Sequence, residues 1–212
     1  LAQQLYEGIE VDGSERVGLI TYMRTDSTNV SQAALSETSK FIVENFGQDF
    51  KQKSPRIYSK KIRGAQEAHE AIRPTSIFRT PESLKSSLDR NQMRLYELIW
   101  NRMVSSQMPD AEYDVTTLDI TANGADNKNY LFRASGRIEK FPGFKILTTD
   151  DESSSEESDS KLPVISENEL LHCQKITPNQ KFTQPPPRFN EASLIRTLEE
   201  SGIGRPSTYA SI

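Results

Sequence analysis

The chain has 212 residues, of which 34% are hydrophobic, so it can form one large or two small domains with a sizeable core in a rather polar protein. No apolar run approaches the roughly 20 residues that span a bilayer, and the N-terminus lacks the basic and apolar regions of a signal peptide, which excludes membrane and secreted classes. One cysteine and two histidines exclude an internal disulfide and a four-ligand Cys/His zinc site. The net charge of -4 depends on residues 150–160, which contain six acids and no base, and without them the chain carries +2. We therefore expect a cytoplasmic protein without a structural metal, whose net charge identifies no partner.

The first segment that suggests chemistry is GLITYMRTDS, residues 18–27. Side chains alternate between the two faces of an extended strand, so Ile20, Tyr22 and Arg24 would share one face. A tyrosine hydroxyl is a poor nucleophile at neutral pH, and a neighbouring cation favours its anion and can pair with a phosphoryl oxygen. The spacing is consistent with phosphoryl transfer to Tyr22, although an ordinary tyrosine at a sheet edge beside an exposed arginine has the same pattern.

Two amphipathic helices are predicted in the first half of the chain. One covers residues 31–47, where Ser31 can cap the N-terminus and Gly47 can end the helix, and the other covers residues 91–104. Inward-facing positions recur at three- and four-residue spacing, as in helices that face a core. They are Ala34, Leu35, Thr38, Phe41 and Ile42 in the first helix and Leu95, Tyr96, Ile99, Trp100 and Met103 in the second.

Two further segments between these helices could bind phosphate. A basic cluster has six cations and no acid, and it consists of Lys51, Lys53, Arg56, Lys60, Lys61 and Arg63. Such a cluster attracts phosphate backbones, although a solvated surface loop is the commoner explanation. In QEAHEAIRP, residues 66–74, a helix would place His69 and Arg73 on one face, where the histidine can donate to a phosphate oxygen or relay a proton. A surface helix with a satisfied histidine is the alternative.

The pattern changes after Pro109, where alternating β-branched residues predict antiparallel strands. These strands are expected at residues 113–122, 129–138, 141–149 and 170–177. The acidic, serine-rich segment near residues 150–160 has too little apolar surface to order itself, so we expect a disordered loop there. Residues 183–189, TQPPPRF, are expected to form a stiff linker.

The C-terminal residues predict a helix, a turn with glycines and the start of a second helix, which is the outline of a helix-turn-helix. Asn190 can cap the first of these helices. The turn GIGRPST, residues 202–208, offers Arg205, Ser207, Thr208 and the N–H groups of a helix start, a combination that suits either a phosphate or a plain capped turn. The chain begins without methionine and stops inside the second predicted helix, so we expect a middle piece of a longer protein.

Three segments in this order and spacing resemble the signatures of the type IA DNA topoisomerases: ITYMRTDS, EAHEAIRPT and PPPRFNEASLIRTLEESGIGRPSTYA. Met23, Glu70 and GIGRPST are typical of the bacterial topoisomerase I branch, because topoisomerase III usually has proline, a second histidine and GIGTPAT-like residues at these places. The resemblance covers essentially the whole chain, but residues 10–17 and the acidic loop belong to no signature. The topoisomerase III and reverse gyrase branches remain alternatives.

The resemblance implies that Tyr22 attacks a phosphodiester of single-stranded DNA, becomes linked to the 5′ phosphate and frees a 3′ hydroxyl. Strand passage through the break would relax negative supercoils without ATP. Arg24 would position the scissile phosphate and stabilise the charge that grows on its oxygens. The same resemblance assigns DNA binding to His69, Arg73, Arg205, Ser207 and Thr208.

The resemblance also implies Mg²⁺ bound by an N-terminal Toprim domain, whose Asp-x-Asp spacing does not occur in this chain. No metal ligand is therefore assigned here, and the chain alone is expected to be inactive. Its partners would be DNA, single-stranded at the cleavage site, and the missing domains of the same polypeptide, with no membrane.

The expected fold class is α+β. A helical active-site domain, residues 1–111, would be followed by an antiparallel β segment that forms part of an arch, residues 112–188, and by the start of a further helical DNA-binding domain, residues 189–212. The alternative from another functional class is a non-catalytic DNA-binding module. In that module the helix-turn-helix outline and the basic cluster would bind phosphates, and Tyr22 would only pack.

Overall fold

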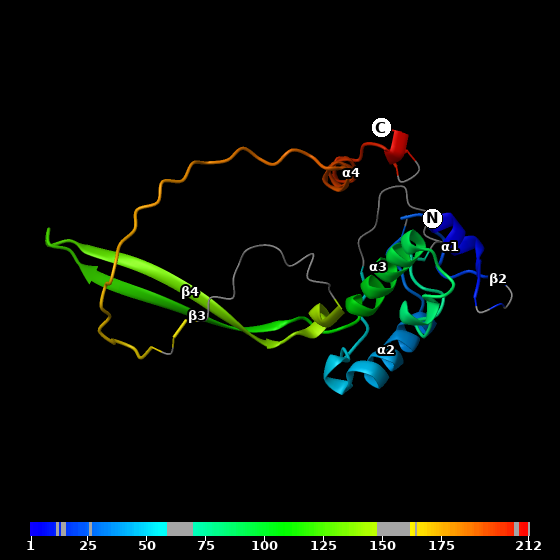
Figure 1. The fold of residues 1–212 in the computed structure, drawn as a ribbon, viewed down its shortest axis with the longest axis horizontal. Helices are drawn as coiled ribbons and strands as arrows, with labels where there is room; N and C mark the ends of the chain where they lie inside the picture. Colours follow the sequence, from blue (N-terminus) through cyan, green and yellow to red (C-terminus); the bar gives the residue numbers. More distant parts are fainter. Residues whose placement is uncertain are drawn as a thin grey trace. The chain divides into compact units, whose positions relative to one another are not determined.

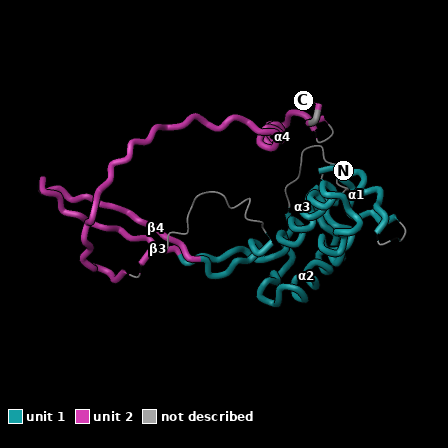
Figure 2. The backbone as a smooth tube through the Cα atoms, viewed as in Figure 1, with its two compact units in different colours: residues 1–114, 139–158 teal, residues 115–138, 159–212 magenta. Residues whose placement is uncertain are grey.

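The computed structural model describes the chain except for residues 12, 14, 15, 26, 59–69, 148–161, 164, 206, 207 and 212. The chain divides into two compact units, residues 1–114 with 139–158 and residues 115–138 with 159–212 (Figure 2). The domain boundaries expected at residues 111 and 188 stay predictions. Among the described residues, no helix has the length and apolar character needed to cross a bilayer.

The first unit is mainly helical (Figure 1). Its α-helices among the described residues are α1 (Ala2–Glu7), α2 (Gln32–Phe46) and α3 (Arg90–Ser106). Two short antiparallel strands, β1 (Ile9–Glu10) and β2 (Arg16–Val17), follow α1. Single 3-10 turns lie at Gln48–Phe50, Glu82–Leu84 and Gly143–Leu147.

The two long helices confirm the sequence prediction, and their ends have local causes. The Ser31 side chain accepts a hydrogen bond from the Ala34 N–H and caps α2, which ends at Gly47 with a positive φ of 94°. Helix α3 begins with a capping box, in which the Asp89 carboxylate and the Gln92 side chain each accept a backbone N–H of the other. These caps satisfy N–H groups that a helix leaves free at its start.

The core of the first unit lies between these helices and the segments around Leu19 and Ile77. All five inward positions predicted in α2 are buried, and in α3 Tyr96, Trp100 and Met103 are buried while Leu95 and Ile99 pack against the core. The Trp100 Nε1–H donates to the Ile77 carbonyl at 2.9 Å, and the Tyr96 hydroxyl donates to the Arg79 carbonyl at 2.6 Å. Burial raises the pKa of Tyr96, so this hydroxyl stays a donor in the physiological range.

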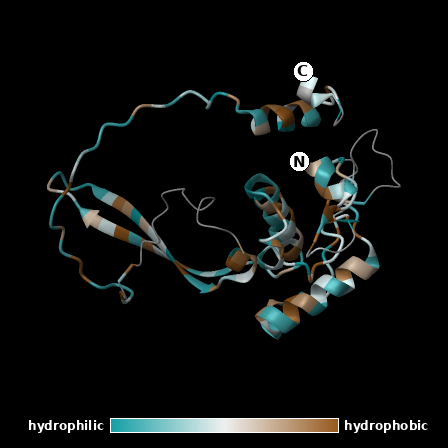
Figure 3. Ribbon diagram, turned by 45° about the vertical axis from the view of Figure 1, so that its right-hand side comes forward, coloured by the Kyte–Doolittle hydropathy of each residue, from teal (hydrophilic) through white to brown (hydrophobic). Residues whose placement is uncertain are grey.

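Strands β3 (Glu112–Asn123) and β4 (Asn129–Phe141) form a two-stranded antiparallel hairpin, which confirms two of the predicted strands. The Gly124 N–H donates to the Lys128 carbonyl across the turn at 2.8 Å, and Arg133 binds Asp119 across the strands at 2.6 Å. Figure 3 shows hydrophobic and hydrophilic bands alternating along both strands, as expected where one face is more apolar than the other. Most side chains of the hairpin are exposed.

Two other predicted strands are wrong. Residues 143–147 form a 3-10 turn, because Gly143 adopts a φ of 51° and lies so close to the chain that a Cβ there would be 2.5 Å from the carbonyl oxygens of Pro109 and Asp110. Residues 170–177 have no regular structure and lie against no strand among the described residues, and Leu170 is 97% exposed. A strand needs a partner edge and a buried face, and the described structure supplies neither here.

The second unit ends in helix α4 (Glu191–Glu200), whose predicted cap is confirmed: the Asn190 side chain accepts from the Ser193 N–H. Gly202 follows with a φ of 69°, and a 3-10 turn lies at Tyr209–Ser211. The linker at residues 183–189 has no regular structure and is exposed. Helices and a small antiparallel sheet together confirm the α+β fold class. The acidic segment lies outside the described residues.

Candidate active site around Tyr22

The tyrosine segment pairs with the second signature segment, which lies about fifty residues further along the chain. Ile20 forms an antiparallel bridge with Pro74; the Thr21 N–H donates to the Arg73 carbonyl at 2.9 Å, and the Thr75 N–H donates to the Leu19 carbonyl at 3.0 Å. Pro74 fits because the bridge needs no N–H from it.

The strand predicted through Tyr22 is wrong beyond this bridge. The Arg73 N–H donates to the Thr21 hydroxyl at 2.9 Å. In a continued antiparallel ladder this N–H would donate to the Thr21 backbone carbonyl, so a side-chain acceptor has replaced a backbone one. Regular pairing therefore stops at Thr21, and Tyr22 and Arg24 follow in irregular backbone.

The expected proximity of a phenol and a guanidinium is nevertheless present. The Arg24 Cζ lies 5.6 Å from the centre of the Tyr22 ring, Tyr22 is half-buried and Arg24 is exposed. The Tyr22 ring also contacts the ring of Tyr6 in α1. The two ring centres are 5.5 Å apart and the ring planes meet at 71°, an edge-to-face arrangement. A phosphate that approached Tyr22 would meet an exposed cation within the same short segment.

Helix α1 supports this segment from behind. The Leu19 N–H donates to the Leu5 carbonyl at 2.7 Å, and Leu5 and Leu19 are both fully buried. Gly18 passes so near α1 that a Cβ there would lie 2.7 Å from the Tyr6 carbonyl oxygen. The close approach explains why this position holds a residue without a side chain.

The segment that follows His69 is not a helix, so the helical interpretation of residues 66–74 is wrong for its described part, residues 70–74. The Ala71 N–H donates to the Asn29 carbonyl at 2.7 Å, and the Ala71 carbonyl accepts from the Thr21 hydroxyl at 2.7 Å. Ala71 thus joins the two ends of residues 22–28, which we call the tyrosine loop.

The Arg73 side chain is directed into the protein, with only 13% of it exposed. Its Nη2 donates to Glu70 Oε2 at 2.6 Å, and its Nη1 donates to the Pro74 carbonyl at 2.9 Å. The Nε atom is buried and makes no hydrogen bond within the described part of the chain. Nη2 also donates to the Ser31 hydroxyl at 3.5 Å, so four of the five Arg73 donors face protein groups or the interior, and DNA contact by Arg73 stays a prediction.

Two predicted site residues, His69 and Ser207, lie outside the described residues. Arg205 and Thr208 belong to the second unit. There the Arg205 N–H donates to the Thr208 hydroxyl at 2.9 Å, and that hydroxyl lies 3.1 Å from the Arg205 carbonyl, as in a capped turn. The Arg205 side chain is exposed.

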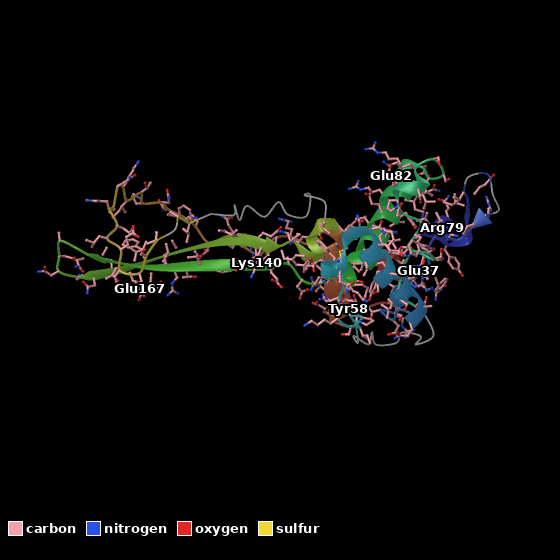
Figure 4. The ribbon with its side chains drawn as sticks, turned by 90° about the horizontal axis from the view of Figure 1, so that it is seen from below. Glu37, Tyr58, Arg79, Glu82, Lys140 and Glu167 are labelled. Carbon is pink, nitrogen blue, oxygen red and sulfur yellow. The ribbon has the colours of Figure 1, made fainter. Side chains whose placement is uncertain are left out.

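The described part of the basic cluster is fastened to the C-terminal end of α3. The Arg56 N–H donates to the Gln107 side chain at 3.0 Å, and its guanidinium binds Asp110 at 2.9 Å, which raises the pKa of Arg56. The Tyr58 hydroxyl, labelled in Figure 4, donates to the Ser106 carbonyl at 3.3 Å, and its own carbonyl accepts from the Thr28 hydroxyl. The segment is therefore anchored next to the end of the tyrosine loop. Lys60, Lys61 and Arg63 lie outside the described residues.

Sequence reasoning missed the residues that hold the site together. Thr21 donates and accepts a hydrogen bond between the two segments, and Glu70 pairs with Arg73. The sequence signals that could have identified them were the Thr21 hydroxyl within an apolar strand pattern and the Glu70 carboxylate three residues before Arg73. No group of three or more His, Cys, Asp or Glu side chains that could hold a metal ion occurs in the part of the chain that is described.

Comparison with known proteins identifies the family. A family model described as DNA topoisomerase matches residues 1–212. The chain is 48% identical to DNA topoisomerase 1 of Rickettsia felis and 47% identical to that of Rickettsia conorii, each over 213 residues that cover 100% of this chain and 27% of the relative. A solved structure of full-length topoisomerase I from Thermotoga maritima is 36% identical, with a TM-score of 0.73, and the match covers 99% of this chain and 32% of that one.

The chain therefore belongs to the bacterial type IA DNA topoisomerase family. The predicted topoisomerase I branch is confirmed by these relatives. The chain spans 27% of the length of the curated relatives that it matches.

Proposed function

We propose that this chain supplies the nucleophile of a type IA DNA topoisomerase, whose substrate is DNA that is single-stranded at the cleavage site. The Tyr22 hydroxyl oxygen forms a bond to the phosphorus of a backbone phosphodiester, and the bond to the 3′ oxygen breaks. The phenol loses its proton and the 3′ oxygen gains one, which leaves a 5′-phosphotyrosine and a 3′ hydroxyl. Passage of a strand through the break, followed by the reverse reaction, relaxes negative supercoils.

The single observation that carries this proposal is the pairing of the two signature segments at Ile20 and Pro74. Residues far apart in the sequence meet beside Tyr22, and a half-buried phenol lies under an exposed guanidinium. Charge that develops on a phosphate oxygen is stabilised by a cation fixed in advance, so Arg24 has the role of positioning the scissile phosphate.

DNA contacts by His69, Arg205, Ser207 and Thr208 belong to the same proposal, supported by their places in the family signatures. The exposed Arg205 side chain leaves its guanidinium available to a phosphate. For Arg73, the paired and largely buried guanidinium favours a structural role beside the tyrosine loop.

The phosphotyrosine bond retains the energy of the phosphodiester, so religation needs no ATP. The family implies Mg²⁺, but the described residues bring together no ligand set that fits it, and we assign it to a domain outside this chain. We further propose that the chain alone is inactive, and that the protein acts in the cytoplasm together with the other domains of its polypeptide.

The proposal is tested with the full-length protein and a single-stranded oligonucleotide that carries a 3′ label. After incubation with Mg²⁺ and denaturation, the unsubstituted protein should show a covalent adduct with the labelled strand, and Tyr22→Phe should show none. Tyr6→Phe is the matched control, because it removes a hydroxyl from the ring that touches Tyr22 and should leave the adduct intact. An adduct that survives Tyr22→Phe would contradict the proposal, and no adduct from any form would favour the non-catalytic DNA-binding module.

A further inference from the structure

The tyrosine loop, residues 22–28, is closed at both ends by the same short segment. At its beginning, the Thr21 N–H donates to the Arg73 carbonyl and the Thr21 hydroxyl donates to the Ala71 carbonyl, at 2.9 and 2.7 Å. At its end, the Ala71 N–H donates to the Asn29 carbonyl at 2.7 Å. The loop that carries Tyr22 therefore cannot change its span unless residues 71–73 move with it.

The Glu70 carboxylate fastens that segment in place. Its Oε1 accepts the Ser31 N–H at 3.0 Å, at the cap of α2, and its Oε2 accepts the Arg73 guanidinium at 2.6 Å. The exposed fractions of the two side chains are 13% for Arg73 and 34% for Glu70. Charge-assisted hydrogen bonds with this degree of burial are stronger than those of surface pairs. One carboxylate thus connects the start of a long helix, the far end of the tyrosine loop and the arginine whose backbone holds the near end.

Both side chains of the pair belong to non-helical backbone next to the tyrosine loop. Arg73 is largely buried, and without Glu70 its guanidinium keeps the Pro74 carbonyl at 2.9 Å and the Ser31 hydroxyl at 3.5 Å as partners. Loss of Glu70 should therefore loosen the tyrosine loop, and the melting temperature separates this local effect from destabilisation of the whole helical unit.

We propose that the Glu70–Arg73 pair is a clamp that holds the tyrosine loop at the span needed for attack, and that Glu70 is a positioning residue for DNA cleavage. The inference rests on the proposed function, because it concerns the approach of the Tyr22 oxygen to the phosphodiester. Arg73 acts through Glu70 and Thr21 and needs no contact with DNA. An error of about 1 Å in the position of a reacting group can reduce a rate about 100-fold, so a loosened loop has a measurable effect.

The test uses the full-length protein with Glu70→Ala and Glu70→Gln. The first removes both hydrogen bonds, and the second retains an acceptor and loses the charge. The matched control is Glu82→Ala, because Glu82 pairs with Lys85 over the same three-residue spacing and is exposed at the surface (Figure 4). Three quantities are measured: the single-turnover rate of adduct formation, the oligonucleotide affinity in a Tyr22→Phe background, and the melting temperature.

The clamp predicts that Glu70→Ala slows adduct formation about 10- to 100-fold while the affinity changes less than about threefold. Glu70→Gln should recover most of the rate, and Glu82→Ala should match the unsubstituted protein. A Glu70→Ala rate equal to the unsubstituted rate overturns the inference. So does a Glu70→Gln protein that melts normally but is as slow as Glu70→Ala, because the retained acceptor then has no positioning effect.

Failure of the proposed function gives a different result. If the unsubstituted protein forms no adduct at all, the nucleophile assignment fails and the clamp fails with it. If that adduct forms and depends on Tyr22 but is insensitive to Glu70, only the clamp fails.

Discussion

Thr21→Val isolates the connection between the two signature segments, because it replaces a hydroxyl with a methyl group at nearly constant volume. The substitution removes the hydrogen bond to the Ala71 carbonyl at 2.7 Å and the one from the Arg73 N–H at 2.9 Å. A buried polar group left without a partner costs about 1 to 3 kcal/mol. Both contacts are only partly buried, so water compensates for some of this loss, and we expect a local destabilisation of about 2 kcal/mol. Since 1.4 kcal/mol is a factor of ten, the segment should open about 30 times more often.

Hydrogen exchange followed by mass spectrometry measures this opening in peptides that contain Arg73. Their exchange should accelerate about 30-fold in the Thr21→Val protein, with distant peptides of α3 unchanged. Thr75→Val is the control, since the Thr75 hydroxyl makes its contact with the Gly18 carbonyl at an exposed position, where water can replace it. Unchanged protection around Arg73, or equal acceleration in both variants, would refute the argument that the Thr21 hydroxyl holds the two segments together.

Two more predictions concern other parts of the molecule. Gly18→Ala should destabilise the first unit by about 1 to 3 kcal/mol, because its Cβ would press on the Tyr6 carbonyl; an unchanged melting temperature would contradict this. In the hairpin, the hydrogen bond from Arg133 holds the pKa of Asp119 below its ordinary 3.8, so this contact stabilises the fold above that pH and its contribution is lost as the pH falls through the lower folded value. Arg133→Gln should raise the Asp119 midpoint in an NMR titration of its carboxyl carbon, and an unmoved midpoint would show that the pair does not form in solution.

The helices were the most predictable part of the fold, because their signals are local. The caps at Ser31 and Asn190 and the stop at Gly47 need only neighbouring residues, and the apolar spacing of α2 and α3 reports the buried face directly. The hairpin was also predictable from alternation and a turn. The strand at residues 170–177 failed because extended backbone becomes a strand only beside a partner, and sequence alternation does not identify one.

The geometry of the candidate site was predictable only in part, and the chemistry assigned to its residues stays a prediction. The family resemblance selected Tyr22 and Arg24, and their proximity follows from a separation of two residues. The pairing of the Tyr22 segment with residues 70–75 is non-local. It depends on the Thr21 hydroxyl, which accepts the Arg73 N–H where a regular ladder would use a backbone carbonyl. The spacing of Glu70 and Arg73 is typical of a helix face, yet the pair forms in non-helical backbone, where it fastens a loop. The spacing of the two residues in the sequence does not distinguish a pair on a helix face from a pair that fastens a loop.

We propose above that one phenolic oxygen, that of Tyr22, forms a reversible ester with the 5′ phosphate of a broken strand. The most direct test of this proposal traps the adduct of the full-length protein with a single-stranded oligonucleotide, digests it with protease and nuclease, and locates the modified residue by mass spectrometry. We predict a peptide in which Tyr22 carries a 5′-linked nucleotide. A nucleotide on any other side chain, or a linkage to a 3′ phosphate, would contradict it.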